Sequence, residues 1–209
     1  MAVIAVDGPA ASGKGTIARA LARHYGLPHM DTGLLYRAVA LNLWRWGGDP
    51  SSEFEALRAT SELNLDAGDP ELRSEPVSKV ASSISAYASV RAALLERQQE
   101  FARQAGGAVL DGRDIGTVIA PDADVKLYVT ASPEVRARRR RQELLGRGMN
   151  VHFEDVLADI RARDERDSTR AAAPLRQAPD ALLLDTSELT IEEAIAKALR
   201  LAQERLADA

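Results

Sequence analysis

The chain has 209 residues, of which 45% are hydrophobic and 28% charged, and its formal net charge is −4 at pH 7. This composition is typical of one globular domain, 1–209, and the acidic balance argues against bulk attraction to nucleic acid or to an anionic membrane. The absence of cysteine excludes disulfides and thiolate zinc sites, and no apolar run approaches the roughly 18 residues of a membrane span, so we expect a cytoplasmic protein.

Strands and helices alternate along the predicted chain. Short apolar runs predict strands at 3–6, 27–30, 108–110, 125–129 and 181–184. Apolar periodicity and capping signals predict helices at 16–25, 34–46, 153–167 and 191–206, with a further helix beginning at Ser132-Pro133-Glu134. Residues 49–80 are rich in turn signals, and residues 144–152 form a glycine-punctuated connection. The alternation predicts an α/β fold in which helices cover both faces of a parallel sheet.

The strongest motif follows the first predicted strand. The segment Gly8-Pro9-Ala10-Ala11-Ser12-Gly13-Lys14-Gly15-Thr16 has the Gly-x4-Gly-Lys spacing of a phosphate-binding P-loop, in the strand–loop–helix context that this loop requires. Its backbone N–H groups are expected to bind the phosphates of ATP, with Lys14 reaching the β- and γ-phosphates. The hydroxyl comes one residue late, at Thr16, which resembles the Gly-Lys-Gly-Thr form of nucleoside monophosphate kinases.

Four charged clusters complete the candidate site: 31–37, 111–114, 136–141 and 163–170. They are rich in arginine and carboxylate and contain no serine–histidine or cysteine nucleophile arrangement. This favours phosphoryl transfer, in which the protein positions two substrates and neutralises charge. A phosphate acceptor is already ionised at pH 7, so no strong general base is required, and Mg²⁺ bridging the donor phosphates is the economical cofactor.

In order along nearly the whole chain, these segments resemble the bacterial cytidylate kinases. The matching residues are Gly13–Thr16, Asp31–Gly33 with Tyr36-Arg37, Val90-Arg91 with Leu94-Leu95, Asp111–Val118, Pro121–Ala123, Arg166-Asp167, and Arg170 with Ala173–Leu175. The resemblance implies a P-loop NTPase-type parallel sheet of about five strands, with a core at 1–35, 105–135 and 180–209. It also implies a small NMP-binding subdomain at 36–104 and a lid at 139–165. The implied reaction moves the γ-phosphoryl group of ATP to CMP and dCMP, with Mg²⁺, in an expected monomer.

The resemblance also assigns roles to individual residues. The acceptor phosphate is gripped by Thr32, Arg37, Arg113 and Arg170, the cytosine is recognised by Ser82, Arg91 and Asp114, and the ribose is contacted by Arg163 and Asp167. The catalytic set is Lys14, Arg113, Arg139, Arg140 and Arg170, and Thr16 and Asp111 are the candidate metal ligands, directly or through water. Asp114 could accept a hydrogen bond from the exocyclic amine of cytosine, where uracil presents another acceptor.

Other interpretations remain open from the sequence. The arginines between 136 and 141 form either a lid helix, with Arg139 and Arg140 facing ATP and the others facing solvent, or a nucleic-acid patch, which we do not expect. A different small-metabolite kinase, of adenylate or shikimate type, would share the P-loop. A guanine-nucleotide switch lacks its Asn-Lys-x-Asp motif here. The three histidines show no metal-ligand spacing and are expected in packing or solvent roles. The interval 63–80 is shorter than the hairpin insert of many family members.

Overall fold

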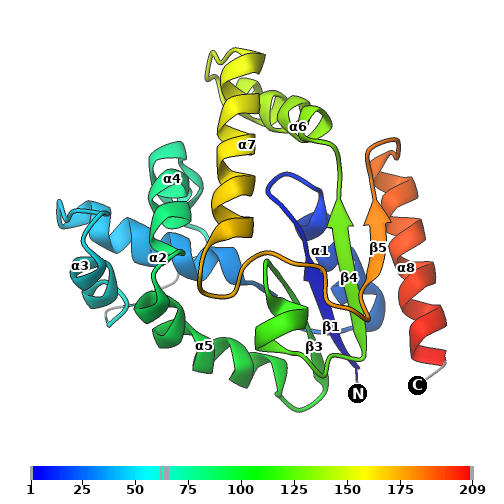
Figure 1. Cartoon of the computed structure of the whole chain (residues 1–209). Coiled ribbons are helices and arrows are strands. Elements are labelled where there is room, and N and C mark those ends of the chain that lie inside the picture. The colour runs from blue at the N-terminus through cyan, green and yellow to red at the C-terminus, as the bar shows by residue number, and fades with distance from the viewer. Residues whose placement is uncertain (1, 62, 64–65, 208–209) are drawn as a thin grey trace.

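The computed structural model describes residues 2–61, 63 and 66–207, so parts of the predicted subdomain at 36–104 and the ends of the predicted domain lie outside the described residues (Figure 1). Five parallel strands form one sheet in the order β2-β3-β1-β4-β5. The strands are β1 (Ala2–Asp7), β2 (His29–Asp31), β3 (Gly107–Gly112), β4 (Val125–Thr130) and β5 (Leu182–Asp185). All five predicted strands are confirmed.

Helices cover both faces of the sheet because successive side chains of a strand point to opposite sides. Ile4 and Val6 pack against helix α1 (Lys14–Tyr25) and helix α8 (Ile191–Ala207) on one face. Ala5 belongs to the core of the other face, which is covered by α5 (Ala88–Ala102) and a short π-helix at Ile115–Ile119. The α/β class predicted from the sequence is therefore confirmed.

A second hydrophobic core lies beside the sheet and is built from α2 (Thr32–Arg45), α3 (Glu53–Arg58), α4 (Glu75–Ile84) and part of α5. A 3-10 turn at Pro70–Arg73 precedes α4. No helix was predicted in 49–80, but Ser52 and Ser74 cap α3 and α4 by accepting hydrogen bonds from backbone N–H groups. Among the described residues of 63–80 there is no strand, in keeping with the short insert.

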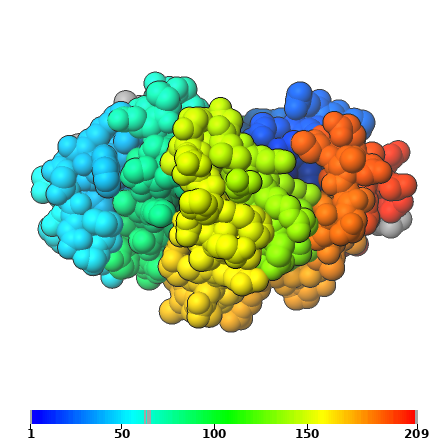
Figure 2. Space-filling model, turned by 90° about the horizontal axis from the view of Figure 1, so that it is seen from above, coloured from blue at the N-terminus to red at the C-terminus, as the bar shows by residue number. Residues whose placement is uncertain are grey.

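Helices α6 (Pro133–Gly146) and α7 (Phe153–Thr169) pack against each other and against Ala10 of the glycine-rich loop. Ser132 caps α6 as predicted, accepting a hydrogen bond from Val135 N. Figure 2 shows the surface of this helix pair directly beside that of α4. Arg140 of α6 pairs with Glu75, and Asp159 of α7 lies 3.5 Å from Lys79. That this helix pair moves as a lid stays a prediction. Within the described part of the chain, no helix is both long enough and apolar enough to cross a membrane.

Candidate active site

The loop between β1 and α1 adopts a backbone conformation that requires glycine at two positions. A Cβ at Gly8 would lie 2.0 Å from the carbonyl oxygen of Val129, and Gly13 has a φ of +91° immediately before α1, so glycine is required at both positions. Ala11 adopts a φ of +58°, which is uncommon for a residue with a side chain. The first helical residue is Lys14, so the unpaired N–H groups of α1 begin where the loop ends. This geometry fits phosphate binding.

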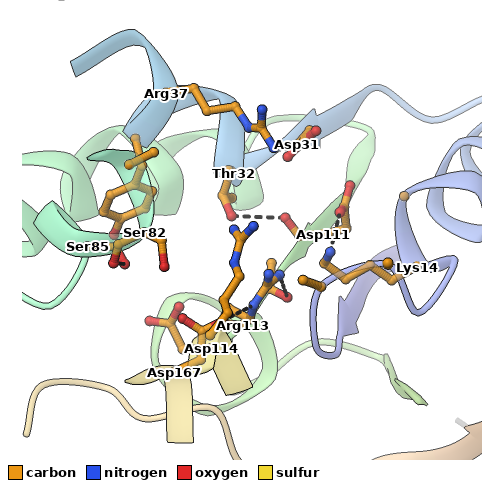
Figure 3. Close-up of a pocket in the computed structure, with 18 of the residues that line it drawn as sticks. Lys14, Asp31, Thr32, Arg37, Ser82, Ser85, Asp111, Arg113, Asp114 and Asp167 are labelled. Atoms are coloured by element: carbon orange, nitrogen blue, oxygen red, sulfur yellow. Dashed lines mark hydrogen bonds and ion pairs between the residues drawn. The ribbon is translucent and has the colours of Figure 1, made fainter. Parts of the chain in front are cut away.

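A cavity of about 190 Å³ opens beside this loop, at the carboxyl ends of β1, β2 and β3. Figure 3 shows Lys14 entering it from the start of α1, Thr32 and Arg37 from α2, Ser82 from α4 with Ser85 just after its end, and Arg113, Asp114 and Asp167 from the remaining side. All nine residues predicted to bind the acceptor line this cavity. Its walls carry seven cationic side chains and four carboxylates, whereas the whole chain has a net charge of −4. The cavity therefore suits an anion.

We call this cavity the acceptor pocket. Ion pairs between arginine and aspartate side chains line its deep side. Asp114 is buried and pairs with Arg91, while its other oxygen lies 3.7 Å from the Arg170 guanidinium. Arg113 donates to Asp167 at 2.7 Å. Ser82 is buried at the edge of the pocket, with its hydroxyl 3.4 Å from Arg166. These ion pairs hold the guanidinium groups in place, and the same arginines still line the cavity.

Near the P-loop, Asp111 connects three elements. Its Oδ2 lies 4.0 Å from Lys14 Nζ, and its Oδ1 lies 2.8 Å from His29 Nε2. The Thr32 hydroxyl donates to the Asp111 carbonyl at 2.9 Å. The contact gives His29 a polar packing role, which agrees with the expectation that the histidines have packing or solvent roles. Only the sheet register, which brings His29 of β2 beside β3, reveals the contact.

Burial and crowding of like charges perturb the cations of the pocket. Burial, reinforced by Arg113, lowers the pKa of Lys14 to about 8 against the opposing effect of Asp111 and Asp31. Burial also lowers the pKa of Arg163 to about 9, again with Arg113 adding to the effect. Burial lowers the pKa of Arg37 to about 10 although Asp31 opposes it. A bound anion would relieve this repulsion, because opposite charge favours the protonated forms.

A larger cavity, about 520 Å³, lies on the other side of the P-loop, between α6 and the start of α8. Thr16 and Arg139 line it, together with Thr186, Leu189 and Ile195, which the sequence analysis did not identify. Arg139 donates to the hydroxyl and carbonyl oxygens of Thr186 at 2.9 and 2.6 Å. Such a cavity, with apolar side chains beside the phosphate loop, has the character of a nucleotide-base site. We call it the donor pocket.

The other arginines of α6 do not all point in the directions that the sequence predicted. Arg140 borders the donor pocket, but its guanidinium pairs with Glu75 and Glu143 instead of facing the P-loop. Arg136 was expected to face solvent, and this is wrong. It is 3% exposed and donates to both carboxylate oxygens of Asp164, at 2.8 and 2.6 Å, and to the Ala10 carbonyl. Arg141 is also turned inward and donates to the Val151 carbonyl at 3.2 Å.

The parallel sheet, with a glycine-rich loop between its first strand and first helix and a pocket on each side of that loop, places the chain in the class of P-loop NTPase-type kinases. A family model described as cytidylate kinase matches residues 4–204. A cytidylate kinase from Xanthobacter autotrophicus is 61% identical over 208 residues, covering 98% of this chain and 99% of the relative. One from Methylocella silvestris is 57% identical over 198 residues, covering 94% and 92%. The chain belongs to the cytidylate kinase family.

Solved structures of lower identity share the fold. TT1252 from Thermus thermophilus has a TM-score of 0.50 at 22% identity, covering 98% of this chain and 97% of that chain. An uncharacterized protein from Eubacterium ventriosum has a TM-score of 0.56 at 12% identity, covering 97% and 99%. These two likenesses concern the fold alone.

Proposed function

We propose that this enzyme transfers the γ-phosphoryl group of ATP to CMP, and to dCMP, giving ADP and CDP or dCDP. The observation that carries the proposal is the cation-rich acceptor pocket in which Asp114 is held between Arg91 and Arg170, next to the P-loop lysine. Family membership supports the same reaction.

In the proposed reaction, a phosphate oxygen of CMP attacks the γ-phosphorus in line while the bond to the ADP oxygen breaks. Backbone N–H groups of the P-loop and Lys14 hold the donor phosphates, and Thr32, Arg37, Arg113 and Arg170 hold the acceptor phosphate. Guanidinium groups suit this task because they stay charged and meet phosphate oxygens in pairs. The rate enhancement then comes from fixed cations around charge that spreads over the transferring group.

Base recognition is assigned to Ser82, Arg91 and Asp114. Asp114 is 4% exposed, so its carboxylate meets the base in a nearly dry setting. A carboxylate there accepts from the cytosine amine but opposes the uracil carbonyl. Arg163 and Asp167, four residues apart on α7, are assigned to the ribose.

The residues present fit a Mg²⁺ ion bound mainly through the nucleotide. Thr16 lies in the first turn of α1, and Asp111 Oδ2 would be 3.6 Å from a Cβ at Gly15, so a hydroxyl and a carboxylate lie on either side of this turn. No group of three or more histidine, cysteine or acidic side chains in the described residues could hold a metal by itself. Mg²⁺ tolerates such a site because it keeps several waters and takes phosphate oxygens. When bound, it would neutralise charge on the donor phosphates.

A panel of acceptors tests the proposal. Purified enzyme with ATP and Mg²⁺ is offered CMP, dCMP, UMP, AMP and shikimate, and ADP formation is followed with a coupled assay. We expect CMP and dCMP to exceed UMP by roughly a hundredfold or more in kcat/KM, as a polar mismatch at a buried carboxylate implies. Equal turnover of AMP, or none of CMP, would refute the assignment. Binding of oligonucleotides that fell with salt would instead favour a nucleic-acid role.

A further inference from the structure

Asp7 occupies the junction between the two halves of the site. It is the last residue of β1 and directly precedes Gly8, yet its side chain is turned away from the P-loop and is 5% exposed. Its Oδ1 accepts the N–H of Ile115 and its Oδ2 accepts the N–H of Gly116, both at 2.8 Å. Both carboxylate oxygens are therefore used by backbone groups from a segment 108 residues further along the chain.

These two bonds close a two-residue turn that carries Arg113 and Asp114. The turn leaves the sheet at Gly112, which pairs with Asp7 in the β1–β3 register, and it reaches the π-helix at Ile115. Both ends of the turn are thus fixed to the same residue of β1. Because β1 also leads directly into the P-loop, this carboxylate joins the far end of the turn to the strand that carries the P-loop, while Asp167 and Arg91 hold the side chains of Arg113 and Asp114 from other elements.

The P-loop itself has additional attachments. Arg136 donates to the Ala10 carbonyl at 3.3 Å, and Thr186 donates to the Ser12 carbonyl at 3.1 Å. Disturbing Asp7 should therefore displace the acceptor turn more than the donor loop.

We propose that Asp7 is a positioning residue that sets Arg113 and Asp114 at their distance from the P-loop, and so couples the acceptor pocket to the donor phosphates. Buried charge is otherwise unfavourable at this position. Burial raises the pKa of Asp7 to about 7, and the repulsion of Asp114 adds to this, while the bonds from Gly116 and Ile115 oppose it. The role in acceptor recognition rests on the proposed function, whereas the attachment of the turn does not.

The test compares Asp7→Asn with Asp124→Asn. An asparagine at 7 retains one acceptor oxygen and turns an amide donor toward the second N–H. Asp124 is the matched control, because its Oδ2 also accepts a backbone N–H of β1, that of Val3 at 2.7 Å, at the end of the strand away from the site. For Asp7→Asn we expect about a tenfold rise in KM for CMP and a smaller CMP-to-UMP preference, with KM for ATP changed less than twofold. Asp124→Asn should lower the melting temperature without these changes.

Hydrogen exchange by NMR supplies a readout that is independent of the substrate. The amides of Ile115 and Gly116 should exchange at least tenfold faster in Asp7→Asn than in the wild type, with the amides of β4 unaffected. Unchanged exchange, or a KM for CMP that moves only as much as in Asp124→Asn, would overturn the proposal. If wild-type enzyme did not phosphorylate CMP, the proposed function would fail, and the exchange rates would still decide whether Asp7 holds the turn.

Gly116→Ala provides a second variant if Asp7→Asn does not fold. A Cβ at Gly116 would lie 3.2 Å from Lys126 Cδ and 3.4 Å from Asp7 Oδ2. The long Lys126 side chain can yield, so the fold should survive, while the added methyl group fills the space beside the carboxylate oxygen that accepts the Gly116 N–H. We expect the same selective rise in KM for CMP, about threefold, and an unchanged KM for CMP in this variant would contradict the proposal.

Discussion

Replacing Arg136 by methionine is expected to destabilise the enzyme far more than removing an exposed arginine from the same helix pair. Arg136 of α6 has a side chain that is 4% exposed and forms a two-pronged ion pair with Asp164 of α7. It also donates to the carbonyl oxygens of Ala131 and Ala10. Its loss leaves two carbonyl groups and the half-buried Asp164 carboxylate without their donor, and together these losses cost about 3–5 kcal/mol.

The matched control is Arg161→Met. Arg161 of α7 reaches Glu134 of α6 at 2.8 Å, so it joins the same two helices, but it is 61% exposed. Solvent screens such a pair, so its contribution to stability is much smaller than that of the buried pair. In a chain of this size, 1 kcal/mol corresponds to roughly 2–4 °C in melting temperature. We therefore expect Arg136→Met to lower the melting temperature by about 6–20 °C and Arg161→Met to lower it by far less.

Denaturation with guanidinium chloride measures the coupling of each pair directly. It is carried out on the two arginine variants, on Asp164→Leu and Glu134→Leu, and on the two double variants. The buried pair should show a coupling of about 1.5 kcal/mol or more, and the exposed pair a much smaller one. Similar losses for Arg136→Met and Arg161→Met, or equal coupling in the two pairs, would refute the argument that burial separates them.

The other expectations concern the reaction, the lid and pH. Lys14→Ala should lower kcat by about a hundredfold or more with little change in melting temperature, and near-normal kcat would contradict its role. Asp114→Ala should reduce the CMP-to-UMP ratio of kcat/KM by more than it raises KM for ATP, and equal weakening would make Asp114 structural. Amide exchange in 145–152 should slow when both nucleotides bind, as expected of a closing lid. Because the pKa of Asp7 rises from 3.8 to about 7 on folding, its contribution to stability is lost as pH rises between these values. Relative to Asp7→Asn, the wild type should therefore lose up to about 4 kcal/mol of unfolding free energy over this pH range, and a constant difference would show that Asp7 titrates normally.

Local signals were sufficient to predict the sheet and the phosphate loop. An apolar run, a glycine turn and a helix follow each other within 25 residues, and each step has a cause in neighbouring residues. The same holds for the Ser132 cap and for the end of α1 at Gly26. Helices α3, α4 and α5 were missed. The first two are short, at 6 and 10 residues, and all three pack on the second core, which sequence periodicity does not reveal.

Contacts between distant segments could not be predicted from spacing. Arg136 belongs to a run of charged residues that resembles a solvated helix face, and only the packing of α7 brings Asp164 to it. Asp111 and His29 are 82 residues apart and meet through the register of β2 and β3. For Arg140, the sequence predicted a side chain near ATP, but Glu75 of α4 is close enough to pair with it.

The lowered pKa values of the pocket cations connect the fold to the binding of a phosphate. Burial and mutual repulsion lower the pKa values of Lys14, Arg163 and Arg37 together, so the fold holds three cations where their charge is unfavourable. Neighbouring carboxylates (Asp111 and Asp31 for Lys14, Asp31 for Arg37 and Asp167 for Arg163) offset the lowering of these pKa values only in part. A phosphate brought among them is attracted to positive charge that the fold already holds in place. Affinity for the acceptor phosphate should therefore come from the positions of these arginines, while discrimination between bases is left to Asp114, whose carboxylate the two neighbouring arginines keep in place.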